Sequence, residues 1–242
     1  PVNDGDRLFL FSSNGVQLAD TVVLSRNHKA RRIPDSSAPF LRPSQRSPGA
    51  LNRFALHDEI VINEILYHAP PRYARAGPPA VAYQDDPEQW IELFNRTAAP
   101  IDLSGWRLRD DIDFRFPDGT VLDPGAYLVV TGDSVALRQK YPDIRILGDW
   151  KGSLGGRTGH VLLQDSDENP AAEVRYFDDA PWPARADGGG SSLELRNPFI
   201  DAAVPEAWAA SDESIRSQWK SYKYRAKAIR PVKTPDLFQF HE

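Results

Sequence analysis

The chain has 242 residues, of which 40% are hydrophobic and 26% charged, so it is long enough to bury a core in one or two domains. It contains no Cys, which excludes disulfides, thiolate metal sites and cysteine nucleophiles, and no apolar run approaches the roughly 20 residues that cross a bilayer. Residues 58–215 carry 28 acidic and 14 basic side chains, a balance that we expect to repel phosphate backbones.

The two ends of the chain are basic, in contrast to its middle. Residues 1–57 carry eight Lys or Arg and four Asp or Glu, whereas residues 216–242 carry seven and two. Shifts of this kind commonly mark module boundaries, so we expect three parts with these limits. The sequence also lacks Met, position 1 included, and we interpret it as a processed or excised piece of a larger protein.

Residues 58–215 are predicted to form many short strands separated by turns. The stretch 60–67 is apolar and β-branched, and turn signals such as Asp123-Pro124-Gly125 recur at the spacing typical of a sandwich. The further strands are expected at 90–94, 101–103, 106–108, 114–116, 126–130, 144–147, 161–164, 173–177 and 192–195. One short helix is expected from Ser134 to Tyr141, with Asp133 as its N-cap. Residues 72–88 are expected to be a long polar loop.

An internal repeat relates the start of the chain to its middle. Residues 5–15 align with residues 159–169, and an acid-led strand follows each, at 20–24 and at 173–177. Residues 1–52 are therefore interpreted as the C-terminal part of an earlier copy of the same domain. The alternative is that two unrelated hairpins share a pattern.

Several ordered motifs in residues 58–213 resemble the bacterial lamin-tail domain. They are Ile62-Asn63-Glu64-Ile65, Trp90-Ile91-Glu92-Leu93-Phe94-Asn95, residues 101–108, Phe116-Pro117-Asp118-Gly119-Thr120 and residues 122–130. Residues 32–35 and 47–52 are similar to the closing motif of the same domain. The middle copy departs from the family after Ser211, where the usual Pro-Gly close is absent, and this leaves its C-terminal boundary open.

The resemblance implies an immunoglobulin-like antiparallel β-sandwich that acts as a binding or tethering module. It implies a place on large secreted or surface bacterial proteins, and it brings no catalytic residues to transfer. Function from fold alone remains an analogy.

Glu64 and Glu92 are the most interesting acids, because each lies in mid-strand among apolar residues. We interpret both as buried structural acids that accept hydrogen bonds from turn backbone or pair with Arg107 or Arg109. The alternative is an acid pair that helps to hold a cation.

Two acidic clusters are weak candidates for calcium. Asp110, Asp111 and Asp113 lie together between strands, and oxygen-rich loops suit this ion. Residues 165–169 begin like a calcium loop, but Pro170 and Tyr176 stand where that loop needs Gly and Glu, so a hairpin tip is expected. The Gly-rich residues 152–159 lack the Lys-Ser/Thr ending of a phosphate loop. We therefore expect no cofactor, with calcium as the weak alternative.

Catalysis has no support in the sequence, because no His pair has ligand spacing and no Ser lies in a Gly-x-Ser-x-Gly context. Lys220, Lys223, Arg225 and Lys227 alternate with aromatic residues. This pattern suits the first strand of a following module, or alternatively a nucleic-acid surface.

These observations favour a non-catalytic structural or adhesive module in a secreted or cell-surface multidomain protein. Its expected partners are other modules of the same polypeptide and a surface protein or polysaccharide, and nucleic acid is not expected. The alternative is an accessory substrate-binding domain of a secreted hydrolase or nuclease.

Overall fold

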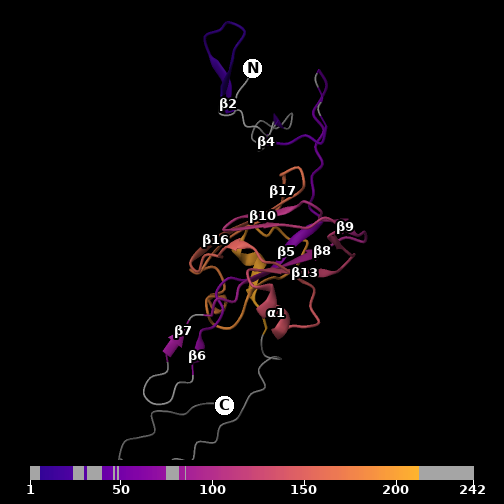
Figure 1. Cartoon of the computed structure of the whole chain (residues 1–242). Helices are drawn as coiled ribbons and strands as arrows, with labels where there is room; N and C mark the ends of the chain where they lie inside the picture. Colours follow the sequence, from indigo (N-terminus) through magenta and orange to yellow (C-terminus); the bar gives the residue numbers. More distant parts are fainter. Residues whose placement is uncertain are drawn as a thin grey trace, which may run out of the picture. The chain divides into compact units, whose positions relative to one another are not determined.

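The structure is a computed structural model that describes residues 6–23, 30–31, 40–45, 47, 49–74, 82–84 and 86–212. In the middle of the chain, two sheets lie one above the other and enclose the core (Figure 1). The all-β sandwich with one short α-helix, as predicted, is confirmed. None of the described helices is long and apolar enough to cross a membrane.

The six-stranded sheet has the order β14-β13-β8-β5-β18-β19. Its strands are β5 (Ile60–Leu66), β8 (Trp90–Asn95), β13 (Tyr127–Thr131), β14 (Ile146–Leu147), β18 (Leu193–Leu195) and β19 (Trp208–Ala210). All neighbours in this sheet are antiparallel except β13 and β14, which run parallel because α1 connects them.

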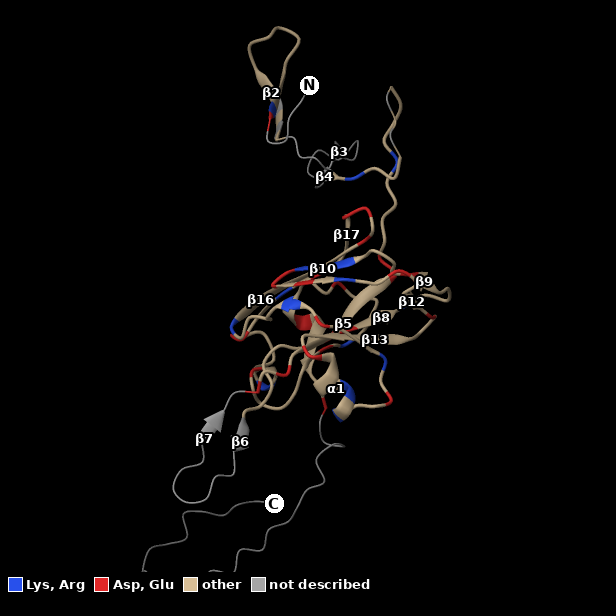
Figure 2. Cartoon of the chain, in the orientation of Figure 1, with Lys and Arg blue, Asp and Glu red and all other residues tan. Residues whose placement is uncertain are grey.

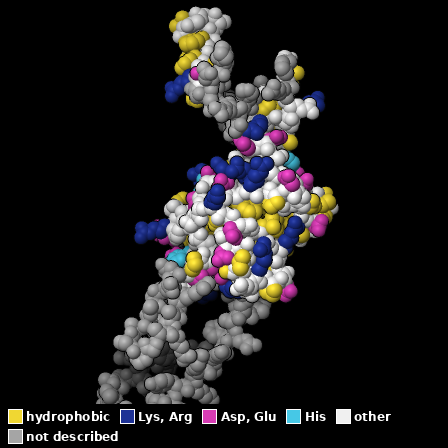
Figure 3. All heavy atoms as spheres, viewed as in Figure 1, with side chains coloured by type: hydrophobic (Ala, Val, Ile, Leu, Met, Phe, Trp, Pro, Cys, Tyr) yellow, Lys and Arg dark blue, Asp and Glu magenta, His cyan; other side chains and the backbone are white. Residues whose placement is uncertain are grey.

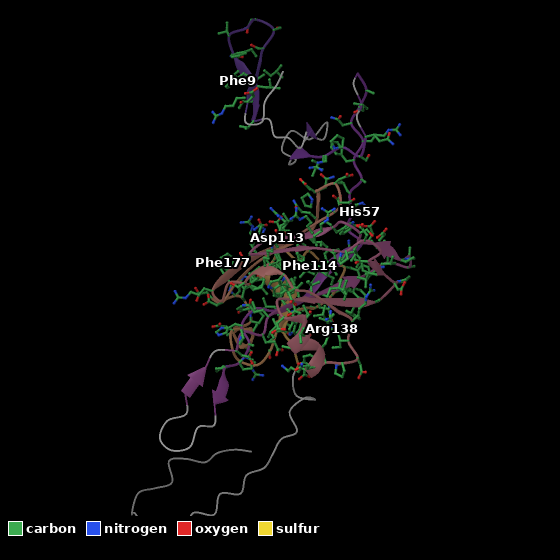
Figure 4. The ribbon with its side chains drawn as sticks, in the orientation of Figure 1. Phe9, His57, Asp113, Phe114, Arg138 and Phe177 are labelled. Atoms are coloured by element: carbon green, nitrogen blue, oxygen red, sulfur yellow. The ribbon has the colours of Figure 1, made fainter. Side chains whose placement is uncertain are left out.

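The five-stranded sheet has the order β15-β11-β10-β16-β17 and is antiparallel throughout. Its strands are β10 (Arg107–Asp110), β11 (Ile112–Arg115), β15 (Lys151–Gly152), β16 (Thr158–Gln164) and β17 (Pro170–Phe177). Alternate residues of each strand face the core, so Phe114 is buried while its neighbour Asp113 lies on the outer face (Figure 4). Branched and aromatic side chains from both sheets fill the space between them.

Two-stranded ribbons complete the β-structure. They pair β1 (Arg7–Phe11) with β2 (Leu18–Val23), β3 (Ala30–Arg31) with β4 (Phe40–Leu41), β6 (Arg72–Ala74) with β7 (Ala82–Gln84), and β9 (Ile101–Asp102) with β12 (Val121–Leu122). The ribbon β6–β7 falls in the region expected to be a polar loop, so that expectation is wrong in part. The sequence signal is missing there because a ribbon of three residues per strand has no apolar run to detect.

Helix α1 (Ser134–Lys140) covers part of the outer face of the six-stranded sheet. It begins as predicted, since Asp133 accepts a hydrogen bond from the Ala136 N–H at 2.9 Å, and it ends one residue before Tyr141. Leu137 packs with Val129 and other apolar residues, and Arg138 donates to the Ile146 carbonyl at 2.8 Å (Figure 4). Two 3₁₀ turns follow at Ala184–Ala186 and Pro205–Ala207.

The turns of hairpins β1–β2 and β16–β17 share one hydrogen bond and one left-handed residue, although the first turn, closed by Ser12 and Gln17, is one residue longer than the second, closed by Asp165 and Asn169. The Gly15 N–H donates to the Ser12 carbonyl at 2.7 Å, and the Glu168 N–H donates to the Asp165 carbonyl at 3.0 Å. Gly15 and Glu168 both lie in the left-handed region, with φ of 71° and 62°. Glu is uncommon in this conformation, which favours Gly. The two turns are therefore alike in backbone conformation rather than in residue type.

The two hairpins also share an irregularity in strand pairing. The register shifts after Leu10 in the first hairpin and after Leu163 in the second. Matching these positions places Ser12 on Asp165. This correspondence differs by one residue from the alignment of Gly5 with Gly159, because residue spacing alone does not locate a bulge.

The described residues as far as Ser211 belong to one compact unit, and Asp212 belongs to a second unit. Of that second unit only Asp212 is described. Residues 216–242, which were assigned to a basic linker or a further strand, therefore lie outside the described residues.

Tyr67 and Tyr176 stack in the core with ring centroids 4.6 Å apart, and their hydroxyls differ in bonding. The Tyr176 hydroxyl donates to the Gly155 carbonyl at 3.0 Å, whereas the buried Tyr67 hydroxyl has no partner among the described residues. We expect Tyr176→Phe to lower the free energy of unfolding by about 1 kcal/mol, because the half-buried Gly155 carbonyl loses its donor. Tyr67→Phe should leave it unchanged or raise it. Urea unfolding of both variants tests this, and an equal loss in both would contradict it.

Candidate functional site

Three glutamates from neighbouring strands form a row on the outer face of the six-stranded sheet. Glu64 of β5 lies opposite Glu92 of β8 on one side and opposite Glu194 of β18 on the other. Adjacent strands are about 4.8 Å apart, and like charges placed opposite each other destabilise a sheet. Hydrogen-bond donors offset part of this repulsion. The Ser192 hydroxyl donates to Glu64, and the Asn63 amide donates to Glu92 at 2.9 Å.

Glu64 and Glu92 are therefore hydrogen-bond acceptors, but two details of the sequence interpretation are wrong. Both side chains are half-buried rather than buried, because they point away from the core. Arg107 and Arg109 lie on the other sheet, where they bind Asp113 at 3.0 and 3.4 Å. Sequence reasoning missed Glu194, because only the strand order places β18 beside β5.

Asp110, Asp111 and Asp113 have different partners although they are close in sequence. Asp110 has a positive φ of 80° and lies 3.0 Å from His160 Nδ1. The Asp111 carboxylate accepts the main-chain N–H groups of Gly155 and His160 at 3.3 and 3.0 Å. Within the described part of the chain, no three acidic or His side chains are placed to hold a metal ion. The sequence predicts no metal site at these residues, with calcium as a weak alternative, and this stays a prediction.

Charged side chains of both signs cover the outer face of the five-stranded sheet (Figure 2). Burial acts to raise the pKa of Asp113, but the hydrogen bond and charge of Arg107, then of Arg109, outweigh it and lower that pKa. Burial also acts to raise the pKa of Glu173, but the hydrogen bonds and charges of His160 and Arg175 outweigh it and lower that pKa. These are surface pairs, and each contributes little to stability.

A shallow depression of about 320 Å³ lies on this face. Its lining residues are Arg107, Arg109, Asp110, Leu162, Gln164 and Glu168. Because both signs line it and Arg107 and Arg109 bind Asp113, the depression offers hydrogen bonds without a strong net charge.

The acidic residues 165–169 lie at the tip of hairpin β16–β17, as the sequence predicted (Figure 2). Asp165 is only 3% exposed, and its carboxylate accepts the main-chain N–H groups of Asp167 and Asn169, both at 2.8 Å. Burial raises the pKa of Asp165, and these two N–H donors offset only part of the rise. The carboxylate therefore organises the turn, at a desolvation cost.

The other sequence candidates do not form a described site. The Gly-rich residues 152–159 run from β15 into β16, and Gly155 donates to Asp111. Lys220, Lys223, Arg225 and Lys227 lie outside the described residues, so the structure tests neither interpretation of them.

Comparison with protein families gives one match. Residues 55–178 match the family described as Lamin Tail Domain. The match covers β5 to β17, which includes the whole five-stranded sheet and most of the six-stranded one. A search of the curated proteins found no match to the chain.

Asp165 offers a test of the hairpin tip. Asp165→Ala removes the acceptor of two main-chain N–H groups, of which the Asn169 one is buried, and we expect it to lower the free energy of unfolding by about 1–3 kcal/mol. Asp165→Asn keeps an acceptor oxygen but carries no charge. Because the folded pKa of Asp165 is raised, Asp165→Asn should be at least as stable as the unmodified protein at pH 7.

The advantage of Asp165→Asn should shrink as the pH falls through the folded pKa of Asp165, because the unmodified carboxyl then becomes neutral as well. Urea unfolding at several pH values is the measurement. An Asp165→Asn variant as unstable as Asp165→Ala at pH 7 would show that the charge itself is needed.

Proposed function

The chain belongs to the lamin tail domain family, a non-enzymatic immunoglobulin-like family, and on that premise we propose that it is a structural and adhesive binding module within a tandem array. The protein that carries it is, in this proposal, a secreted or cell-surface multidomain protein of a bacterium. The partners are neighbouring modules of the same polypeptide and a surface protein or polysaccharide.

The observation that carries the tandem arrangement is the likeness of hairpins β1–β2 and β16–β17. They share the turn hydrogen bond, the left-handed residue and the position of the bulge. A shared turn alone is common among hairpins, but the bulge at the matching strand position is an independent feature. This supports the interpretation of residues 1–52 as the C-terminal part of an earlier copy.

Exposure of the matched positions supports the same interpretation. Val161 and Leu163 of β16 are 0% exposed, because β5 and the rest of the core cover them. Their counterparts Leu8 and Leu10 are 49% and 63% exposed, and Phe9 on the opposite face of β1 is 55% exposed (Figures 3 and 4). A hairpin with apolar side chains on both faces is suited to a sandwich whose other strands cover it.

The outer faces of residues 58–215, here called the complete module, support binding rather than catalysis. Acids and bases on the five-stranded sheet are paired with each other, and the glutamates on the other sheet accept hydrogen bonds from side chains. Charged and polar side chains held by such pairs suit recognition of a polar partner surface.

A hairpin exchange tests the tandem arrangement. Residues 5–25 would replace residues 158–177, so that Leu8 and Leu10 take the positions of Val161 and Leu163. We expect the exchanged chain to unfold cooperatively in a thermal scan, because matched side chains re-enter the same core. The control carries Leu8→Ser and Leu10→Ser in the exchanged hairpin and should lose the transition. An exchanged chain with no cooperative transition, beside an unmodified chain that has one, would count against the earlier copy.

The alternative, an accessory domain that binds a nuclease substrate, is tested through charge. Residues 58–215 have twice as many acidic as basic side chains, so a fragment of these residues should not bind DNA or RNA at moderate salt. The full chain should bind weakly at most, with an affinity that collapses as salt rises, because counterion release by its basic ends is the main driving force. Fluorescence anisotropy at two salt concentrations measures this. Salt-resistant binding by the fragment would favour the alternative.

A further inference from the structure

The segment before the complete module is bound to the tip of hairpin β16–β17. The Arg42 N–H donates to the Asn169 side-chain oxygen at 2.7 Å, and the Asn169 amide donates to the Arg42 carbonyl at 2.9 Å. One carboxamide therefore satisfies both main-chain groups of Arg42, as a neighbouring strand would. Asn169 is only 1% exposed.

A second contact joins the same two segments. The Arg42 guanidinium donates to the Glu168 carboxylate at 2.7 Å, and Leu41 beside it is buried. Glu168 occupies the left-handed position of the turn. An ion pair that is also a hydrogen bond, next to a buried apolar side chain, is stronger than an isolated surface pair.

The chain then loops out and returns to the module. The Ser44 N–H donates to the Arg53 carbonyl at 2.9 Å, which closes the loop between them. Beyond it the His57 ring lies 5.2 Å from the Trp106 ring, and His57 Nδ1 is 3.2 Å from a Glu59 oxygen (Figure 4). The stretch 41–57 is therefore held at both of its ends.

We propose that the tip of hairpin β16–β17 is a docking site for the segment that precedes a module, so that the end of one module is held on the next one instead of swinging on a free linker. The interpretation of residues 1–52 as a preceding module rests on the proposed function, whereas the docking of Arg42 does not. The occupant is Arg42, whose main chain is recognised by Asn169 and whose guanidinium is recognised by Glu168.

The tip of hairpin β1–β2 does not have the Glu and Asn side chains that bind Arg42 in hairpin β16–β17. Gly15 stands at the position of Glu168, since both have a left-handed φ. Gln17 stands at the position of Asn169, since the Gln17 carbonyl accepts the Ser12 N–H and the Asn169 carbonyl accepts the Asp165 N–H. Gln17 is exposed, so it provides a matched control with the same functional group in an equivalent turn.

Amide hydrogen exchange of Arg42 in the full chain, followed by NMR, tests the proposal. We expect the Arg42 amide to be protected, and Asn169→Ala to speed its exchange at least tenfold while amides of β5 and β8 keep their rates. Gln17→Ala should change nothing. A smaller acceleration is expected for Glu168→Gln, which removes the charge and keeps the shape. An unprotected Arg42 amide in the unmodified chain, or no effect of Asn169→Ala, would overturn the proposal.

A second measurement covers the case in which Asn169→Ala also loosens the module, seen as faster exchange in β5. Because the chain has no Cys, Ser166→Cys provides a single attachment point for a spin label on the exposed tip. The label should broaden the amide signals of Leu41, Ser44 and Gln45. Arg42→Pro removes both the main-chain donor and the guanidinium without altering the hairpin, and it should relieve the broadening. Broadening that is absent, or unaltered by Arg42→Pro, would refute docking. If docking holds while the hairpin exchange fails, only the tandem interpretation is lost.

Discussion

The apolar layer between the two sheets is the constraint on which the rest of the structure depends. Each sheet has one face that must leave water, and the core residues Ile62, Leu93, Val161 and Leu163 are almost completely buried where the faces meet. Because alternate residues of a strand point to opposite faces, this layer also determines which side chains remain outside. The charged residues of β10, β11, β16 and β17 are on the surface for that reason, and they neutralise one another there.

Amide side chains connect the loops to this framework. Asn95 is fully buried and donates to the carbonyls of Ala99 and Leu122 while it accepts from Thr97. Gln89 exchanges hydrogen bonds with both main-chain groups of Leu154, at 2.9 Å each. The Asn169 side chain likewise forms hydrogen bonds with both main-chain groups of Arg42. A carboxamide has a donor and an acceptor at a fixed spacing, so it can replace a strand partner where no strand is present.

In the proposed function, the recognition chemistry of this module lies at its ends and on its outer faces, while its interior serves stability. The hairpin tip shows how these roles meet. Asp165 organises the turn from inside, at a desolvation cost, and the next residues of the turn hold the incoming chain from outside. Changes to Asp165 therefore affect folding, whereas changes to Asn169 affect mainly the connection to the preceding segment. This separation fits a module that must tolerate neighbours without altering its own core.

The fold class, the single helix with its Asp133 cap, the family resemblance and the hairpin at residues 165–169 could be predicted from the sequence, because periodicity, capping and turn chemistry are local properties. The sequence also identified Glu64 and Glu92 as acids that need partners. The identity of those partners depends on the strand order, which no local pattern reveals. The Ser192 hydroxyl donates to Glu64 because β18 lies beside β5, and Arg107 and Arg109 bind Asp113 because they belong to the other sheet. The contact between Arg42 and Asn169, 127 residues apart, had no local signal at all, since strand order and long-range docking depend on how distant segments share one core.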